Sequence, residues 1–387
     1  MVESKHKESQ KEQSNPSKGG GALLVAAGIF LSRIMGLVRQ KIFAFYFGNS
    51  DYGDAFYAAL KIPNFLQNLL GDGVLSASFI PVYTQLKSRG YSKEADRVAG
   101  FVGSLLALMT SLISAMGVWA TPLLIDVIAP GFVGEKKELT ILLVQIFFPG
   151  TALLVMSAWC LGILNSHRKF FLSYAAPVVW NLAIIGALVF YGSSFFGYHQ
   201  EPAHLVVTAA WSVFVGSCLQ FFVQIPSVLA VAKNLKWGLH LRKNSSEVQS
   251  SIATIFKNFI PVVFSRGVVQ LSAYIDNVIA SWLPTGAVSA LSYAQSLYML
   301  PISLFGMSVS AAELARMSEA HGTEDEISQV LKNRLVTGVQ QISFFVIPSV
   351  MGFWIIGDVI IRVLYRGGEF DEYAVRTYSP NVHSIGL

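Results

Sequence analysis

The chain has 387 residues and a net charge of +5, with 53% hydrophobic and only 13% charged residues. Soluble domains carry about 25% charged residues, so this composition excludes an ordinary soluble domain. The mean hydropathy is +0.52, and apolar runs of about 20 residues recur, the length that crosses a bilayer. Together these features predict an all-α polytopic membrane protein.

The alternation of polar and apolar segments predicts the elements in chain order. Residues 1–20 are polar and lack aromatic side chains, which is typical of a disordered cytoplasmic tail. Residues 373–387 look like the opening of a further span that the chain does not complete, so we expect a C-terminally truncated gene product. Between them we expect nine spans, at 22–47, 55–86, 98–128, 139–164, 172–196, 204–232, 252–283, 286–318 and 332–365.

The distribution of charge predicts the orientation of the spans. Segments around 87–97 and 233–243 hold several Lys and Arg residues, whereas those around 49–54 and 284–286 hold none. The lysine pair at 136–137 is the main exception. Because cytoplasmic loops are enriched in Lys and Arg, we expect the N-terminus in the cytoplasm.

A polar segment divides the chain into two parts. Residues 236–251 are the expected cytoplasmic linker between a six-helix lobe, 21–235, and a partial second lobe, 252–387, with three helices and the start of a fourth. The run VFSR at 263–266 is similar to FLSR at 30–33. Six spans separate the copies, so both point the same way and predict a parallel repeat. Chance similarity between apolar segments is the alternative.

The first span carries two arginines at bilayer depth, Arg33 and Arg39. An arginine there costs roughly 2.5–3.5 kcal/mol, so such residues face a bundle interior or a wet cavity. Ser32 and Arg39 are two turns apart and share one face, and Arg33 lies on the neighbouring stripe. Cations that face a cavity predict an anionic substrate, bound by Ser32, Arg33 and Arg39. The alternative, that the cations reach an interface, suits Lys41 better than Arg33.

The second span begins with a polar face. Asp54 and Lys61 are seven residues apart and lie on the same side of a helix, so we include both among the substrate-binding candidates. We expect Asp54 to pair with Arg39 or Lys41 and to hold them in orientation. The alternative is that Asp54 is the N-cap of this helix.

The same span contains two interruptions. Pro63 removes a backbone donor and predicts a kink or a break. The run Gly71-Asp72-Gly73 predicts a second bend. Irregular backbone at membrane depth is tolerated where it lines a cavity, so we expect this span to border one.

The seventh span carries a further polar face. Arg266, Gln270 and Asn277 share it, and Asp276 lies beside Asn277. Arg266 is a third candidate cation for the substrate, and Asp276, like Asp54, is expected to hold cations or to sense ions. The alternative for Arg266 is an anchor at the inner membrane interface.

The sequence has no catalytic or metal-binding pattern. It contains no nucleotide-binding loop, no GxSxG motif, no His/Asp/Ser set and no Cys/His cluster. We therefore expect no enzyme, no metal, no cofactor and no nucleic-acid partner. The energy for transport is expected to come from a coupling cation or from the membrane potential.

Five short runs stand in a fixed order along the chain. They are SRIMGLVR at 32–39, DAF at 54–56, KIPNF at 61–65, GVLSASFIP at 73–81 and APGF at 129–132. Together they resemble the MurJ/MviN family of lipid II flippases, within the multidrug/oligosaccharidyl-lipid/polysaccharide exporter superfamily. The resemblance covers essentially the whole chain after the tail.

The resemblance implies two six-helix lobes around a central cavity, with two extra helices. It implies flipping of lipid II, the undecaprenyl-diphosphate-linked peptidoglycan precursor, from the inner to the outer leaflet of the bacterial plasma membrane by alternating access. Arginines that match Arg33 and Arg39 engage the diphosphate in the family, and Asp54 matches a family aspartate. The implied partners are lipid II, membrane lipids and the cell-wall synthesis machinery.

The chain departs from the family pattern at several polar positions. Gln40 stands where an acidic residue is often found, and Gln67-Asn68 and Gln295-Ser296 stand where arginines are common. We expect Arg266 to replace one of these cations. Three alternatives stay open at this point: an exporter of other lipid-linked oligosaccharides or of drugs, an integral-membrane glycosyltransferase, and a scaffold for wall-synthesis proteins.

Overall fold

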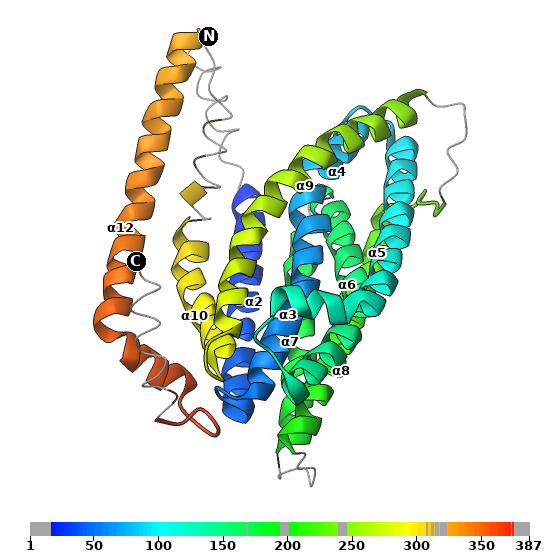
Figure 1. The fold of residues 1–387 in the computed structure, drawn as a ribbon. Coiled ribbons are helices and arrows are strands. Elements are labelled where there is room, and N and C mark those ends of the chain that lie inside the picture. The colour runs from blue at the N-terminus through cyan, green and yellow to red at the C-terminus, as the bar shows by residue number, and fades with distance from the viewer. Residues whose placement is uncertain are drawn as a thin grey trace, which may run out of the picture.

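The computed structural model describes residues 17–167, 169–193, 201–238, 246–306, 309–310, 313, 317, 323–372 and 374. Regular structure in these residues is helical, apart from an isolated bridge between Gly367 and Phe370 (Figure 1). The helices are α2 (Ser17–Phe47), α3 (Asp51–Leu70), α4 (Asp72–Ser88), α5 (Ser92–Ile128), α6 (Gly134–Ser166), α7 (Phe170–Gly192), α8 (Pro202–Val231), α9 (Ser246–Ser281), α10 (Ala287–Pro301), the π-helical turn η2 (Ile302–Gly306) and α12 (Glu324–Tyr365).

The nine predicted spans correspond to these helices wherever the structure describes them. The second span is the pair α3 and α4, and the eighth is α10 with η2. Helix α2 begins at Ser17, inside the segment predicted to be a disordered tail. The rest of that tail lies outside the described residues, as does almost all of the predicted final opening at 373–387.

The predicted interruptions of the second span have different outcomes. Pro63 does not break the helix, because α3 continues through it to Leu70. The break comes at Gly71, whose φ of −96° and ψ of −131° are not helical. Its backbone N–H still donates to the carbonyl of Gln67 at 2.7 Å, which closes α3 before α4 begins. The two-glycine run, and not the proline, therefore divides this span.

Helices α2–α8 are called here the first group, and α9, α10, η2 and α12 the second group. Helix α6 lies at the centre of the first group. It packs against α3, α5 and α8, while α7 packs between α8 and α2. Trp159 on α6 is fully buried, and its indole N–H donates to the carbonyl of Ala99 on α5 at 3.1 Å. The ring lies against Gly103, where a Cβ would approach it to 2.9 Å. A small residue on α5 thus allows close packing of the two helices.

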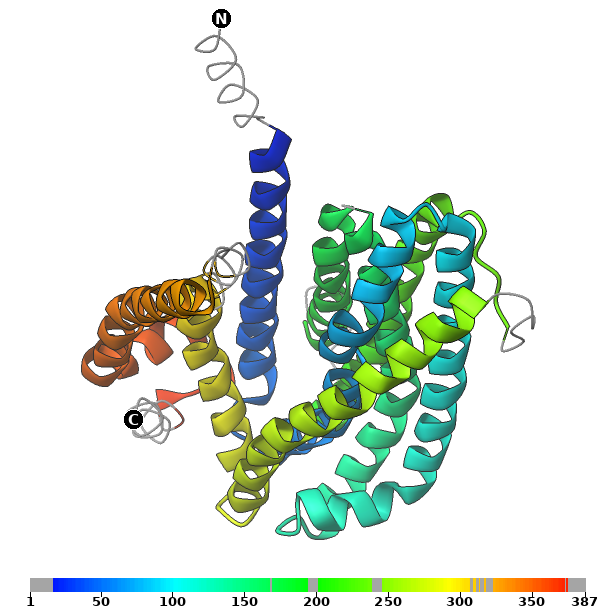
Figure 2. The ribbon, with the colours of Figure 1, turned by 90° about the horizontal axis from the view of Figure 1, so that it is seen from above.

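Two hydrophobic cores lie at opposite ends of the bundle, and α9 contributes to both. Val248, Ile252 and Ile255 of α9 pack into the core built mainly by α4, α5 and α6. Ala280, near the other end of α9, belongs to the core shared by α2, α3 and α10. Figure 2 shows α9 running obliquely from the side of α4 and α5 to α10. Helix α9 therefore connects the first group of helices to α10.

The end where α2 meets α3, α5 meets α6 and α9 meets α10 is called here the closed end. An aromatic cluster joins four helices there. The ring centroids of Phe43 and Phe56 are 4.5 Å apart, those of Tyr57 and Tyr293 5.2 Å, and those of Tyr293 and Tyr365 5.3 Å. All five side chains are buried, so apolar burial holds α2, α3, α10 and α12 together at this end.

Two turns at the closed end touch the opposite group of helices through backbone atoms. A Cβ on Gly131 would collide with the carbonyl of Ser281, and its N–H donates to Ser281 Oγ at 3.2 Å. A Cβ on Gly48 would collide with the carbonyl of Glu369. Glycine at these positions allows the two groups to approach more closely than larger residues do.

Large apolar side chains cover the outer surface of the bundle. Trp119 on α5 is 87% exposed, Phe264 on α9 73% and Ile355 on α12 69%. Among the described residues, six helices are long and apolar enough to cross a membrane. A soluble monomer rarely exposes contiguous apolar surface on this scale, so these faces contact lipid and the chain is a multi-pass membrane protein.

A buried carboxylate ties four segments together at the other end of the first group. Asp96 on α5 is 1% exposed and accepts hydrogen bonds from Lys87 at 2.9 Å, from Tyr83 at 3.3 Å and from the backbone N–H of Asn234 at 3.1 Å. The Tyr83 hydroxyl also lies 2.9 Å from Nε2 of His167. Burial, with the charge of Lys87, lowers the pKa of His167, so its ring is mainly neutral at pH 7.

Replacing Asp96 is therefore expected to destabilise this end. In Asp96→Ala the ammonium of Lys87 and the N–H of Asn234 lose a buried acceptor, which costs about 3 kcal/mol of unfolding free energy. Denaturant titration in detergent micelles measures it. Lys93→Ala, an exposed change on the same helix, is the control and is expected to alter stability by less than about 0.5 kcal/mol. Equal stability of the two variants would contradict the structural role of Asp96.

Candidate functional site

A cavity of about 1100 Å³ lies between the two groups of helices. Five of the seven predicted site residues line it: Ser32, Arg33 and Arg39 from α2, Lys61 from α3 and Asp276 from α9. Helices α6, α7, α8 and α10 supply the rest of the wall. Residues far apart in the sequence thus surround one polar space.

The arginines of α2 occupy different environments in this cavity. Arg33 is exposed, and Arg39 is half-buried. The guanidinium of Arg39 lies 4.8 Å from the centre of the Trp180 ring on α7, within the range of a cation–π interaction. Nε of Arg39 is buried and has no hydrogen-bond partner in the described residues. Trp180 therefore positions a cation whose donors are not all used by the protein.

Two further buried polar atoms on α7 have no hydrogen-bond partner in the described part of the chain. They are the indole nitrogen of Trp180 and Oδ1 of Asn181, and both residues line the cavity. The amide nitrogen of Asn181 donates to the carbonyl of Pro177 at 2.9 Å. Buried polar groups are usually hydrogen-bonded, so this part of the wall is suited to a polar ligand.

Lys61 extends from α3 to the opposite wall. Its ammonium donates to Oε1 of Gln295 on α10 at 2.7 Å. Its backbone carbonyl accepts a hydrogen bond from the hydroxyl of Tyr274 on α9 at 2.9 Å. Asp276, one helix turn beyond Ser272 on the same wall of α9, is the carboxylate among the residues that line the cavity. Lys61 therefore joins the two groups of helices across the cavity.

Gln40 makes a second polar connection across the cavity. It is 6% exposed, and its amide donates to the hydroxyl of Ser296 on α10. Its Oε1 accepts a hydrogen bond from the hydroxyl of Tyr365 on α12 at 3.2 Å. The neutral residues at 40, 295 and 296 thus pair with one another or with Lys61 instead of carrying charge.

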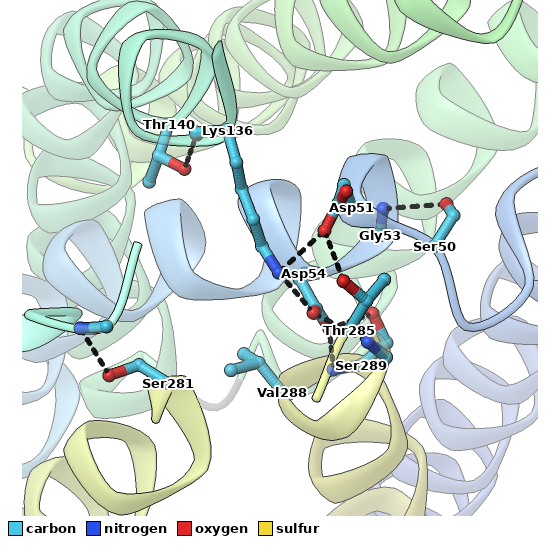
Figure 3. A network of polar contacts seen from close by, with 12 residues as sticks. Ser50, Asp51, Gly53, Asp54, Lys136, Thr140, Ser281, Thr285, Val288 and Ser289 are labelled. Carbon is cyan, nitrogen blue, oxygen red and sulfur yellow. Dashed lines mark hydrogen bonds and ion pairs between the residues drawn. The ribbon is translucent and has the colours of Figure 1, made fainter. Parts of the chain in front are cut away.

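Asp54 is not part of the cavity, and its predicted pairing with Arg39 or Lys41 is wrong. It is 1% exposed and lies at the closed end, where Lys136 of α6 reaches it at 2.7 Å (Figure 3). It also accepts hydrogen bonds at 2.8 Å from the backbone N–H groups of Gly286 and Ser289 and from the Ser289 hydroxyl. The N-cap alternative is wrong too, because Ser50 caps α3.

Lys136 joins a second carboxylate to this group. Asp51 lies 2.8 Å from its ammonium and accepts a hydrogen bond from Thr285 at 2.9 Å. Partial burial opposes ionisation of Asp51, but its bonds to Lys136 and Thr285 outweigh this and lower its pKa, so it is ionised at neutral pH. Asp51, Asp54, Lys136, Thr285, Gly286 and Ser289 are called here the Asp54 network, and they link α3 and α6 to the start of α10 (Figure 3).

Arg266 does not line the cavity, so its predicted role as a replacement cation has no support in the geometry. It is exposed, and its guanidinium lies against Gly73 at the start of α4, where a Cβ would collide with it. Gln270, one turn further along α9, does line the cavity. Arg266 lies about 6 Å from Gln270 along the helix axis, at 1.5 Å per residue, and its guanidinium packs against Gly73, which does not line the cavity.

Sequence reasoning missed three residues of these sites. Trp180 and Asn181 lie in an apolar span with no charge to draw attention to them. Lys136 departs from the charge bias, but nothing in the sequence connects it with Asp54. The polar pair Trp180-Asn181 inside an apolar span is the sequence feature that could have indicated that α7 borders the cavity. No group of His, Cys, Asp and Glu in the described residues is arranged to hold a metal ion.

The sequence of this chain is similar to those of known proteins. The family model described as "Lipid II flippase MurJ" matches residues 43–387. The chain belongs to the MurJ family. Among its relatives, the lipid II flippase MurJ of Burkholderia cenocepacia is 29% identical over 95% of this chain and 69% of its own length. The probable lipid II flippase MurJ of Rhizobium tropici is 32% identical over 88% of this chain and 62% of its own.

Solved structures agree with this assignment. One match is a lipid II flippase MurJ in an inward closed conformation, with a TM-score of 0.76 and 26% sequence identity. The match covers 94% of this chain and 72% of the flippase chain. An inward-facing MATE transporter of the MOP superfamily covers 95% of this chain and 80% of its own, with a TM-score of 0.70 and 15% identity. The second likeness concerns the fold alone. The predicted exporter fold is confirmed.

The Asp54 network predicts a measurable effect at the closed end. In Asp54→Asn, Lys136 loses its buried partner and the start of α10 loses a charged acceptor. Because a hydrogen bond to a charged group contributes about 1.5–3 kcal/mol, amides near Gly286 and Ser289 are expected to exchange about tenfold faster or more. Hydrogen–deuterium exchange with mass spectrometry measures this.

Asp126→Asn is the matched control for this experiment. Asp126 pairs with Lys137 near the same end, but its side chain is 56% exposed, and exposed pairs contribute about 0–1 kcal/mol. Exchange near Gly286 is expected to stay unchanged in this variant. If both variants gave the same exchange, the Asp54 network would not hold the closed end.

Proposed function

We propose that this chain flips lipid II from the inner to the outer leaflet of the bacterial plasma membrane by alternating access, for peptidoglycan synthesis. The observation that carries the proposal is the cavity of about 1100 Å³ in which Arg33, Arg39 and Lys61 converge. Membership of the MurJ family supports the same substrate, because its relatives are named for it.

The charge of the cavity suits a diphosphate. Its lining residues include three cations, Arg33, Arg39 and Lys61, and one carboxylate, Asp276, which leaves two positive charges in excess. A charged headgroup does not cross hydrocarbon unaided. Charge-assisted hydrogen bonds from arginine replace the water that a phosphate loses. Nε of Arg39, which is buried and has no partner among the described residues, is available to donate such a bond.

The orientation that we propose places the N-terminus in the cytoplasm and the closed end on the outer side. The lysines at 136 and 137, which depart from the charge bias, are both paired with carboxylates, Asp51 and Asp54 for the first and Asp126 for the second. Paired lysines contribute less free positive charge to the outer side. The inside-negative potential then favours outward movement of an anion, with or without a coupling cation.

Alternating access requires the closed end to separate. The contacts that hold it are the Asp54 network, the aromatic cluster and the approach of Gly131 to Ser281. Substrate that draws Lys61 from Gln295 removes one connection between the two groups of helices. This supports a mechanism in which binding in the cavity shifts the balance toward opening of the closed end.

A related exporter of other lipid-linked oligosaccharides is the second candidate. The observation that favours it is that neutral side chains stand at 40, 295 and 296, where Gln40 pairs with Ser296 and Gln295 accepts a hydrogen bond from Lys61. These positions leave the cavity with few charges beyond those of α2 and Lys61. A cargo with the same diphosphate but a different glycan would meet the same cations.

Replacing Arg39 tests the proposed anion site. Arg39→Gln is expected to weaken binding of lipid II about 10- to 100-fold, because charge-assisted hydrogen bonds contribute about 1.5–3 kcal/mol. Flipping, measured by leaflet accessibility of the lipid in reconstituted vesicles, should fall in parallel. The control is Lys41→Gln, an exposed cation of α2 outside the cavity. An Arg39→Gln variant that flips as well as Lys41→Gln would refute the proposed function.

Replacing Trp180 tests how Arg39 is positioned. Trp180→Leu removes the aromatic face under the guanidinium, and a cation–π interaction contributes about 0.5–2 kcal/mol. Lipid II binding is expected to weaken about 2- to 30-fold. Trp180→Phe keeps an aromatic face and should restore most of the loss. If leucine and phenylalanine at this position behaved alike, the ring face would not be what positions Arg39.

A further inference from the structure

One wall of the cavity is lined by carboxamides instead of charges. Asn64, Gln67 and Asn68 of α3 line it together with Gln270 of α9. The three α3 carboxamides follow Lys61 by three, six and seven residues, so they lie along the same side of the helix as Lys61. The four carboxamide residues Asn64, Gln67, Asn68 and Gln270 are called here the amide wall.

Most hydrogen-bonding groups of the amide wall are free of protein partners in the described residues. The amide of Asn68 donates to Oε1 of Gln270 at 3.5 Å, a long hydrogen bond. Asn64 and Asn68 are exposed to the cavity, and Gln67 and Gln270 are half-buried. Each carboxamide has two donors and an acceptor oxygen, so the wall presents both kinds of group.

Other carboxamides near the cavity show what a structural role looks like. Gln220 and Gln224 on α8 are buried, and both donate to the hydroxyl of Ser157 on α6, at 3.0 and 2.6 Å. These side chains join two helices of the same group. Within the described part of the chain, the amide wall has no comparable bonding, so helix packing does not account for it.

The chemistry of the wall selects a class of ligand. Neutral amides do not compensate a full negative charge as arginine does, and they offer little to an apolar surface. Sugar hydroxyls and acylamino groups both donate and accept hydrogen bonds, as carboxamides do. Lys61 lies about 4.5 Å along α3 from Asn64, at 1.5 Å per residue. In a lipid-linked glycan the first sugar is bonded directly to the diphosphate, so a sugar here would adjoin a phosphate held by Lys61.

We propose that Asn64, Gln67, Asn68 and Gln270 form a subsite for the sugar portion of the lipid-linked cargo. The inference rests on the proposed function, in which the diphosphate occupies the cationic part of the same cavity. Since α3 and α9 lie on opposite sides of the Asn68–Gln270 contact, a sugar between them exchanges one long hydrogen bond for several to its hydroxyls. Cargo without sugar lacks this contribution.

The test compares three lipids bound to the chain in nanodiscs: undecaprenyl diphosphate, the same lipid carrying sugars without peptide, and lipid II. Gln67→Leu, Asn68→Leu and Gln270→Leu are each expected to weaken binding of both sugar-bearing lipids about 2- to 12-fold, the contribution of one hydrogen bond. Binding of undecaprenyl diphosphate should change less than twofold. Gln249→Leu, an exposed change on α9 outside the cavity, is the control.

Other patterns of lipid binding would overturn the sugar subsite. Thermal unfolding of each variant in the nanodisc checks its folding independently of the lipids, and any one variant that unfolds like the parent decides the matter. In such a variant, equal weakening of all three lipids, or of none, overturns the sugar subsite, and so does weakening of lipid II alone, which would assign the wall to the peptide. Arg39→Gln in the same assay separates the two proposals. If it weakens none of the lipids, the proposed function fails; if it weakens all three while the leucine variants change nothing, only the subsite fails.

Discussion

The buried carboxylate of Asp54 is the constraint on which the arrangement of this molecule depends. A carboxylate that is 1% exposed is tolerated only when it is paired and hydrogen-bonded. Its partners come from two places, Lys136 on α6 and the backbone and side-chain groups at the start of α10. The positive end of the α10 helix dipole adds to this attraction. Satisfying one charge therefore requires the two groups of helices to meet at this end.

The same contact determines where the cavity lies. Because the groups are held at the closed end, the polar faces of α2, α3 and α9 are brought to a common space without being packed together. Arg39 then rests on Trp180, while Lys61 spans to Gln295. Arg39 is thus held by a neutral ring, and a ligand anion does not have to displace a protein carboxylate from it.

Much of this arrangement could be predicted from residue type alone. Polar side chains at membrane depth are costly, so Ser32, Arg33, Arg39 and Lys61 could be assigned to a cavity before any helix was positioned. Their partners could not be predicted in this way. Asp54 pairs with Lys136 because the α5–α6 turn reaches it, and Arg266 leaves the cavity because Gly73 makes room on α4. Such outcomes depend on which helices meet, and periodicity within one helix does not contain that information.

The close approach of Gly131 to Ser281 has a consequence for mutational tolerance. A single methyl group at Gly131 would act as a wedge between two backbones, and neither Gly131 nor Ser281 lines the cavity. Damage there need not unfold the opposite end of the bundle, because a separate core built mainly by α4, α5 and α6 lies there. The expected phenotype is a transporter with intact ligand chemistry and a shifted resting state. Inactivating substitutions at such glycines therefore report on conformational balance and not on recognition.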